Sequence, residues 1–164
     1  MPGAGGSIAL NNIYSIAPPD GLTIVTPLVS VLNAQIIGEK SVQYDARRFR
    51  WIGRTQDAAR VLVLSNRVSA TMLEDFQTRE IVVGAVGQAS DTAANAYFMN
   101  GLFKTRFRVI AGYGASSKAM MAIMSGETQG AFTTWDNIAT NHKTEWKDGV
   151  LRPVLQIGFE RQPE

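Results

Sequence analysis

The chain has 164 residues, 45% of them hydrophobic and 18% charged, a composition typical of about one folded domain or of two small lobes, which excludes wholesale disorder. Lys and Arg number 16 and Asp and Glu 14, so the net charge of +2 provides no basis for binding nucleic acid through its phosphates. Cysteine is absent and His142 is the one histidine, which excludes disulfides, thiol nucleophiles and metal sites built from thiolates or several histidines. We therefore expect neither a metal ion nor a cofactor.

The first third of the sequence predicts short helices and strands. Ser7 is a typical N-cap for the first helix, and Gly38 is a typical residue to follow the second. The Arg-rich run 47–50 is interpreted as a solvated surface turn. The expected helices are 7–17 and 31–37, and the expected strands are 22–26, 49–52 and 60–64.

From residue 71 onward, predicted helices and strands alternate. Thr71 and Glu74 are expected to form a capping box at the first helix, and Gly126 to end the third. Such alternation is typical of an α/β fold with parallel strands joined by helical crossovers. The expected helices are 71–78, 91–102, 116–125 and 136–147, and the expected strands are 80–86, 107–111, 130–133 and 150–157.

Three loops that lead from a predicted strand into a predicted helix are rich in Gly, Ser, Thr or Asn: 87–92, 112–117 and 133–137. In an open α/β sheet, ligands bind beyond the carboxyl ends of the strands, where helix N-termini present unpaired backbone N–H groups. Together these loops predict a site for a small anion such as a carboxylate. The alternative is purely structural, because Ser and Asp before a helix cap it and Gly after a strand turns the chain.

A fourth candidate is the Gly-rich loop 2–7. It is neither a dinucleotide-binding fingerprint nor a P-loop, because Ile8 stands where the fingerprint needs a small residue and no Lys follows. The sequence contains no paired-carboxylate pattern and no nucleophile-elbow motif. It offers binding chemistry without catalytic machinery, so we expect a protein that is not an enzyme.

The remaining conspicuous side chains are assigned structural roles. His142 lies in a polar stretch and is expected on a solvated surface. Trp135 either packs in the core or lines the pocket. The methionines at 120, 121 and 124 are expected to fill the core.

In their order and spacing, several stretches resemble the extracytoplasmic solute receptors of tripartite tricarboxylate transporters, known as Bug-type receptors. The resemblance covers essentially the whole chain, and the set of stretches in this order is its specific signal. The matching stretches are 2–6, 17–21, 44–47 with Phe49, 84–90, 113–115, 125–130 and 135–137.

This resemblance implies a type II periplasmic-binding-protein fold, in which two α/β lobes close on a small organic acid. It implies that 1–66 and 150–164 form an incomplete first lobe and 67–149 the second lobe, with hinge strands near 64–68 and 149–152. Because family members begin with a signal peptide and continue beyond the equivalent of Glu164, we expect a fragment of a periplasmic receptor. The implied partners are a small organic acid or amino acid and the membrane subunits of the transporter, and not nucleic acid.

Carried over by position, the resemblance assigns ligand contacts to both lobes. Backbone N–H groups and hydroxyls would hold carboxylate oxygens, in part through water. The first-lobe contacts are Gly3, Ala4, Gly5, Gly6 and Ser7. The second-lobe contacts are Gln88, Ala89, Ser90, Asp91, Thr92, Tyr113, Gly114, Ala115, Ser116, Ser117 and Asp136.

One position departs from the family, whose members often have only Gly and Ser where this chain has Asp91. A carboxylate there would repel an anion unless it caps its own helix or meets an amino group. This leaves an amino acid ligand open. Lys118, one turn into its helix, could add a cation or lie on the surface.

Two other functions are compatible with the same loops. The first is an α/β enzyme or a nucleotide- or phosphate-binding domain, for which the chain supplies only the isolated Asp91, Asp136 and His142. The second is a ligand-sensing domain that signals to a partner protein by the same closure. A fused regulatory domain would distinguish sensing from transport.

Overall fold

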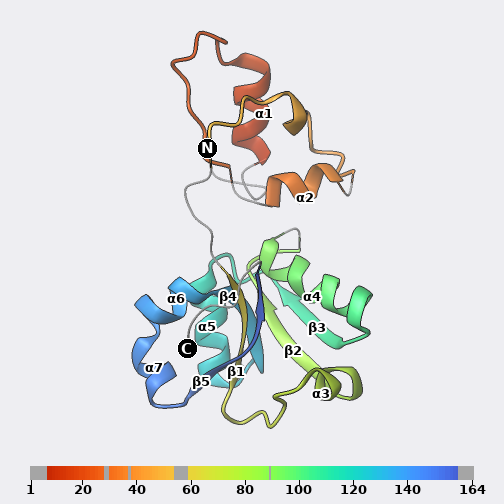
Figure 1. Cartoon of the computed structure of the whole chain (residues 1–164), viewed down its shortest axis with the longest axis vertical. Coiled ribbons are helices and arrows are strands. Elements are labelled where there is room, and N and C mark those ends of the chain that lie inside the picture. The colour runs from red at the N-terminus through yellow and green to blue at the C-terminus, as the bar shows by residue number, and fades with distance from the viewer. Residues whose placement is uncertain (1–6, 28–29, 37, 54–58, 89, 159–164) are drawn as a thin grey trace. The chain divides into compact units, whose positions relative to one another are not determined.

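The computed structural model describes residues 7–27, 30–36, 38–53, 59–88 and 90–158 (Figure 1). The chain divides into two compact units, residues 1–54 and 55–164. Each is considered by itself. In the described parts of both, no helix is long and apolar enough to cross a membrane.

The first unit is helical where it is regular. It contains α1 (Ser7–Ile16), α2 (Ser30–Ile36) and the 3₁₀ turn η2 (Ala46–Arg48). Its small core is formed by Leu10, Val31 and Tyr44, and the Tyr44 hydroxyl donates a hydrogen bond of 2.6 Å to the Val31 carbonyl. The arginine run lies in an exposed turn as predicted, where Arg47 pairs with Asp45 at 2.9 Å.

The strands predicted at 22–26 and 49–52 are wrong, because both segments are irregular. Leu22 and Ile24 are 86% and 75% exposed. Strand propensity describes how well a side chain fits a paired, half-buried sheet. Within the described residues of this unit, neither segment has a strand to pair with.

The second unit is built on a five-stranded sheet in the order β3-β2-β4-β1-β5. Strand β2 is parallel to β3 and to β4, whereas β1 is antiparallel to β4 and to β5. The strands are β1 (Arg60–Ser65), β2 (Glu80–Ala85), β3 (Arg106–Ala111), β4 (Gly130–Thr134) and β5 (Leu151–Ile157).

The strands from residue 71 onward, β2 to β5, all run in the same direction, as predicted, and β1 runs against them. The segment between β1 and β2 contains only the short helix α3 (Leu73–Thr78). Strand β2 begins at the edge of the sheet where β1 ends, and the two strands run in opposite directions. Strand β5 lies at the edge of the sheet, and Pro153 lies beside a shift in its register with β1. A proline is tolerated there because it interrupts no hydrogen bonds between central strands.

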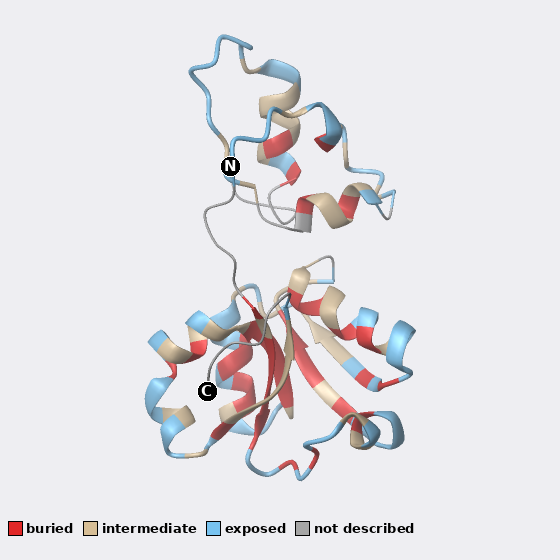
Figure 2. Cartoon of the chain, viewed as in Figure 1, coloured by how far each residue is buried: buried red, intermediate tan, exposed pale blue. Residues whose placement is uncertain are grey.

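Helices cover both faces of the sheet (Figures 1 and 2). Alternate residues of β1 face opposite sides of the sheet. Leu62 and Leu64 pack with α3 and α4, and Val61 and Val63 pack with α5 and α6. This alternation gives the unit two apolar cores, one on each face. The remaining helices are α4 (Asp91–Phe103), α5 (Ser116–Ser125), α6 (Trp135–Asn141) and α7 (Lys143–Lys147).

Several predicted details shift. The carboxylate that caps α3 belongs to Asp75, not Glu74, and accepts the backbone N–H groups of Thr71 and Met72 at 2.9 and 3.1 Å. These two hydrogen bonds lower the pKa of Asp75. Among the three methionines assigned to the core, Met120 is buried and Met124 is partly buried, but Met121 is 63% exposed.

His142 corrects a further prediction, because it is buried, with 9% of its surface exposed. The helix predicted over 136–147 breaks here into α6 and α7, since His142 has a non-helical backbone (φ −130°, ψ 27°). Its Nδ1 lies 4.0 Å from Glu145 Oε1. The polar neighbours in the sequence gave no sign of this break.

The unit boundary falls at 54/55, whereas the expected lobe boundaries are 66/67 and 149/150. Strands β1 and β5, assigned to the first lobe, are hydrogen-bonded into the sheet of the second unit. The division into lobes of a complete receptor therefore stays a prediction.

Gly130 provides a test of the β1–β4 contact. A Cβ atom at this position would lie 2.5 Å from Leu64 Cδ2 and 2.6 Å from the Val63 carbonyl oxygen. We expect Gly130→Ala to lower the free energy of unfolding by about 1–3 kcal/mol, measured by urea denaturation. Gly101→Ala is the control: it fills open space on α4 and should raise that free energy by up to about 1 kcal/mol. Equal urea midpoints for the two variants would contradict the close packing of Gly130 against Leu64.

Candidate functional site

The carboxyl ends of β2, β3 and β4 meet at one edge of the sheet, because these strands are parallel. The described residues that follow them, 86–88 with Ser90 and 112–115, and the β4–α6 junction at Thr134 therefore lie along this carboxyl edge (Figure 1). Strand β1 runs the other way, so its first residue, Arg60, also lies here, opposite Thr134. The three loops predicted from the sequence thus share one edge.

The edge contains a topological switch point between β2 and β4. From β2, helix α4 leads to β3 on one side. From β4, helices α6 and α7 lead to β5 on the other side, and α6 packs on the face opposite α4. Connections that leave neighbouring strands in opposite directions open a crevice beyond their carboxyl ends, which is the usual ligand site of such sheets.

The β2–α4 loop is closed by its own hydroxyl groups. Ser90 Oγ donates to the Gly87 carbonyl at 2.6 Å and, as the N-cap of α4, accepts from the Ala93 N–H at 3.3 Å. Thr92 Oγ1 accepts from the Val86 N–H at 3.1 Å and lies 2.8 Å from Ser90 Oγ. Helix capping and loop closure, the structural alternative to ligand binding, therefore account for the side chains of Ser90 and Thr92.

The β3–α5 loop is held against the end of β2 by its backbone. The N–H groups of Gly112 and Tyr113 donate to the Ala85 carbonyl at 3.2 and 3.3 Å, and that of Gly114 donates to the Val86 carbonyl at 3.0 Å. These three N–H groups are therefore not available to a ligand. Their hydrogen bonds also fix the position at which α5 begins.

The Tyr113 side chain is also engaged. Its hydroxyl donates to Glu127 Oε1 at 2.8 Å. Burial and this carboxylate raise the pKa of Tyr113 to about 12. The ring packs over Gly84, where a Cβ would lie 3.1 Å from it. Tyr113 therefore anchors the loop through its side chain.

The N-terminus of α5 differs from those of α4 and α6, because its N-cap, Ala115, makes no side-chain cap hydrogen bond. By contrast, Ser90 caps α4 and Thr134 caps α6. The first N–H groups of an α-helix have no partner within the helix. In α5 these include the N–H groups of Ser116 and Ser117, whose side chains are exposed. They point along the positive end of the helix dipole toward the carboxyl edge.

At the β4–α6 junction, Thr134 Oγ1 accepts from the Asn137 N–H at 3.2 Å, and Thr133 Oγ1 accepts from the Asn137 side chain at 3.0 Å. Asp136 is exposed in the first turn of α6. Trp135 packs against Trp146, with ring centroids 5.0 Å apart, beside the second core. The first of its two predicted roles, core packing, is therefore the one the structure supports.

Sequence reasoning did not identify Arg60 as a site residue. Its Nη2 pairs with Asp91 Oδ2, and the Asp91 Oδ1 accepts from the Thr92 N–H at 2.9 Å. A charged residue at the start of a predicted strand was visible in the sequence. Its position beside Asp91 depends on the order and direction of the strands, which the sequence did not reveal.

The remaining predicted contacts divide into three groups. Gln88 is exposed, and its Oε1 accepts from the Tyr97 hydroxyl at 2.5 Å. Ser7 is buried at the first position of α1, in the first unit. Gly3, Ala4, Gly5, Gly6 and Ala89 lie outside the described residues.

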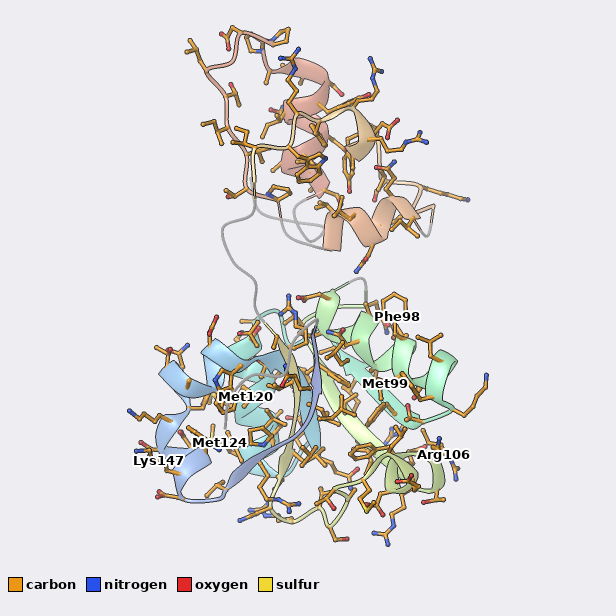
Figure 3. The ribbon with its side chains drawn as sticks, viewed as in Figure 1. Phe98, Met99, Arg106, Met120, Met124 and Lys147 are labelled. Carbon is orange, nitrogen blue, oxygen red and sulfur yellow. The ribbon has the colours of Figure 1, made fainter. Side chains whose placement is uncertain are left out.

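A hollow of about 530 Å³ lies elsewhere, between α4 and β5, with Phe98 and Met99 among its apolar lining residues (Figure 3). Such a lining offers few donors for an anion. Across the described segments, no group of three or more His, Asp or Glu residues is arranged to hold a metal ion. Of these two places, the carboxyl edge is the one with donors suited to a small anion.

Comparison with known proteins identifies the fold. The sequence matches no family model and no curated protein. Among solved structures, a TctC solute-binding protein from Polaromonas matches 98% of this chain with a TM-score of 0.76 and 14% identity. The periplasmic binding protein BugD matches 97% with a TM-score of 0.72 and 16% identity. A protein of R. palustris solved with adipate matches 97% with a TM-score of 0.63 and 13% identity.

These matches cover 55%, 53% and 54% of the three solved proteins, so the chain spans about half of their length. The chain therefore has the α/β fold of periplasmic binding proteins, represented in part. The predicted fold class, with an incomplete lobe, is confirmed.

The cap of α4 can be tested by substitution. We expect Ser90→Ala to lower the free energy of unfolding by about 1 kcal/mol, because the Ala93 N–H loses its acceptor. Urea denaturation measures the change. Ser90→Thr retains a capping hydroxyl and should restore most of the loss. If Ser90→Ala left stability unchanged, the hydroxyl would not be the structural cap described above.

Proposed function

We propose that the chain is part of an extracytoplasmic solute receptor of the Bug type, which binds a small carboxylate and is not an enzyme. The observation that carries this proposal is the fold, which matches TctC and BugD over nearly the whole chain. The uncapped N-terminus of α5 at the switch point supports it, because unpaired N–H groups at a helix N-terminus favour an anion.

The proposed mechanism is capture between two lobes. One lobe would correspond to 67–149, and loop 3–7 would contribute from the other. Closure about hinge strands near 64–68 and 149–152 would hold the ligand's carboxylate against the α5 N-terminus. The closed form would then be offered to the membrane subunits of a tripartite transporter. Such a receptor would act in the periplasm.

The ligand is proposed to be an organic acid or an acidic amino acid. The neighbour solved with adipate shows that this fold accommodates an aliphatic acid in that protein. Because the hydroxyls of Ser90 and Thr92 are hydrogen-bonded within their own loop, we expect backbone N–H groups to make the contacts with the ligand. Among the predicted contacts, those of Ala115, Ser116 and Ser117 are the best placed.

Thermal unfolding in the presence of malate, adipate, succinate, glutarate, aspartate, glutamate and ATP tests this function. A ligand that binds the folded state raises the melting temperature as its concentration increases. We expect at least one acid to do so and ATP to have no effect. A response to ATP alone would favour the nucleotide-binding alternative, and no response to any acid would contradict the proposal.

One pair of variants tests the contact with α5. Ser116 occupies the first helical position, and Ala115 before it is extended (φ −149°, ψ 149°), so a proline at 116 is compatible with the helix. Ser116→Pro removes one backbone N–H and should weaken binding of the responding acid about tenfold. Ser116→Ala keeps that N–H and serves as the control. Equal affinities measured by calorimetry would exclude this N–H as a contact.

A further inference from the structure

The ion pair between Arg60 and Asp91 spans the switch point. Arg60 begins β1, and Asp91 begins α4, directly after the β2 loop. Strand β4 lies between β1 and β2 in the sheet. The pair must therefore cross the carboxyl end of β4, close to Thr134, which is opposite Arg60 in the β-ladder. This places a cation and an anion where the crevice between β2 and β4 opens.

Both side chains are shielded but accessible. The exposed fractions are 27% for Arg60 and 30% for Asp91. Arg60 shares its strand face with Leu62 and Leu64, which belong to the core beneath α4. Charges partly withdrawn from water interact more strongly with a ligand than fully solvated ones. A small molecule at the carboxyl edge can still reach them.

The pair retains capacity for hydrogen bonds. Arg60 has a guanidinium with five N–H donors, of which the described contacts engage Nη2 with Asp91. Asp91 Oδ2 meets Arg60 and Oδ1 accepts from the Thr92 N–H. Each carboxylate oxygen has a second lone pair. Arg60 can thus donate to a carboxylate while Asp91 accepts from an ammonium group.

We propose from this geometry that the Arg60–Asp91 pair determines the class of ligand. This inference rests on the proposed function. Arg60 binds a carboxylate, and Asp91 both positions Arg60 and meets an ammonium group on the same molecule. The preferred ligand is then an acidic amino acid, with one net negative charge. A dicarboxylate of the same length lacks the ammonium group and brings a second uncompensated charge near Asp91.

Two pairs of probes test this preference, each pair with one carbon skeleton: aspartate with succinate, and glutamate with glutarate. Binding is measured by calorimetry on the wild-type protein and its variants. We expect at least one amino acid to bind with an affinity at least about tenfold higher than that of its dicarboxylate counterpart. One charge-assisted hydrogen bond between the ammonium group and Asp91 would provide a difference of this size. Asp91→Asn should shift that ratio about tenfold toward the dicarboxylate.

Arg60→Gln should weaken both members of the responding pair, and Arg60→Lys should weaken them less, because it keeps the charge without the planar fork. The control is Arg108→Gln, which breaks the Arg108–Glu80 pair of 2.9 Å, where β2 begins, at the opposite edge of the sheet. The double variant Arg60→Gln/Asp91→Asn separates a contact from a structural role. It should remain weak, since neutralising both charges does not restore the lost donor. Thermal unfolding without probe confirms that each variant folds.

Three results would overturn the inference while the proposed function stood. These are equal binding of a probe by wild type and Arg60→Gln, wild-type affinity in the double variant, or response only to acids without an ammonium group. If no acid binds at all, the proposed function fails and the inference fails with it.

Discussion

The parallel alignment of β2 with β3 and β4 is the constraint on which the rest of the second unit depends. It brings the N-termini of α4, α5 and α6 to one edge of the sheet. The packing around these strands is close: Gly84 of β2 leaves little room for a Cβ beside the Tyr113 ring, and Gly130 of β4 leaves none beside Leu64 of β1. The connections that leave β2 and β4 diverge, to β3 on one side and to β5 on the other, which leaves a crevice between the ends of the two strands.

The hydrogen bonds of that edge distinguish structural groups from available ones. Ser90 and Thr134 satisfy their own helices, and the β3–α5 loop satisfies β2. What remains is the N-terminus of α5 and the Arg60–Asp91 pair. A backbone N–H cluster and an arginine are both suited to a carboxylate. The proposed site is therefore defined by the groups that the local structure leaves available rather than by the most polar sequence motif.

The sequence predicted the regular part of the second unit well. Helix α5 begins at Ser116 and ends before Gly126 as expected, because periodicity and a left-handed glycine at φ 85° agree. Local patterns failed where distant contacts decide. The burial of His142 depends on a helix break, and the irregular 22–26 segment has no strand to pair with among the described residues of the first unit. Arg60 was missed for the same reason, since its partner lies 31 positions away along the sequence.

Amide chemical-shift mapping of the ¹⁵N-labelled protein during titration with glutamate and adipate shows where on the second unit an acid binds. We expect the largest shifts on residues 115–118, on 90–93 and on Arg60, all at the carboxyl edge. Shifts centred on Phe98 and Leu155, in the apolar hollow between α4 and β5, would contradict it. So would the absence of saturable shifts with either acid.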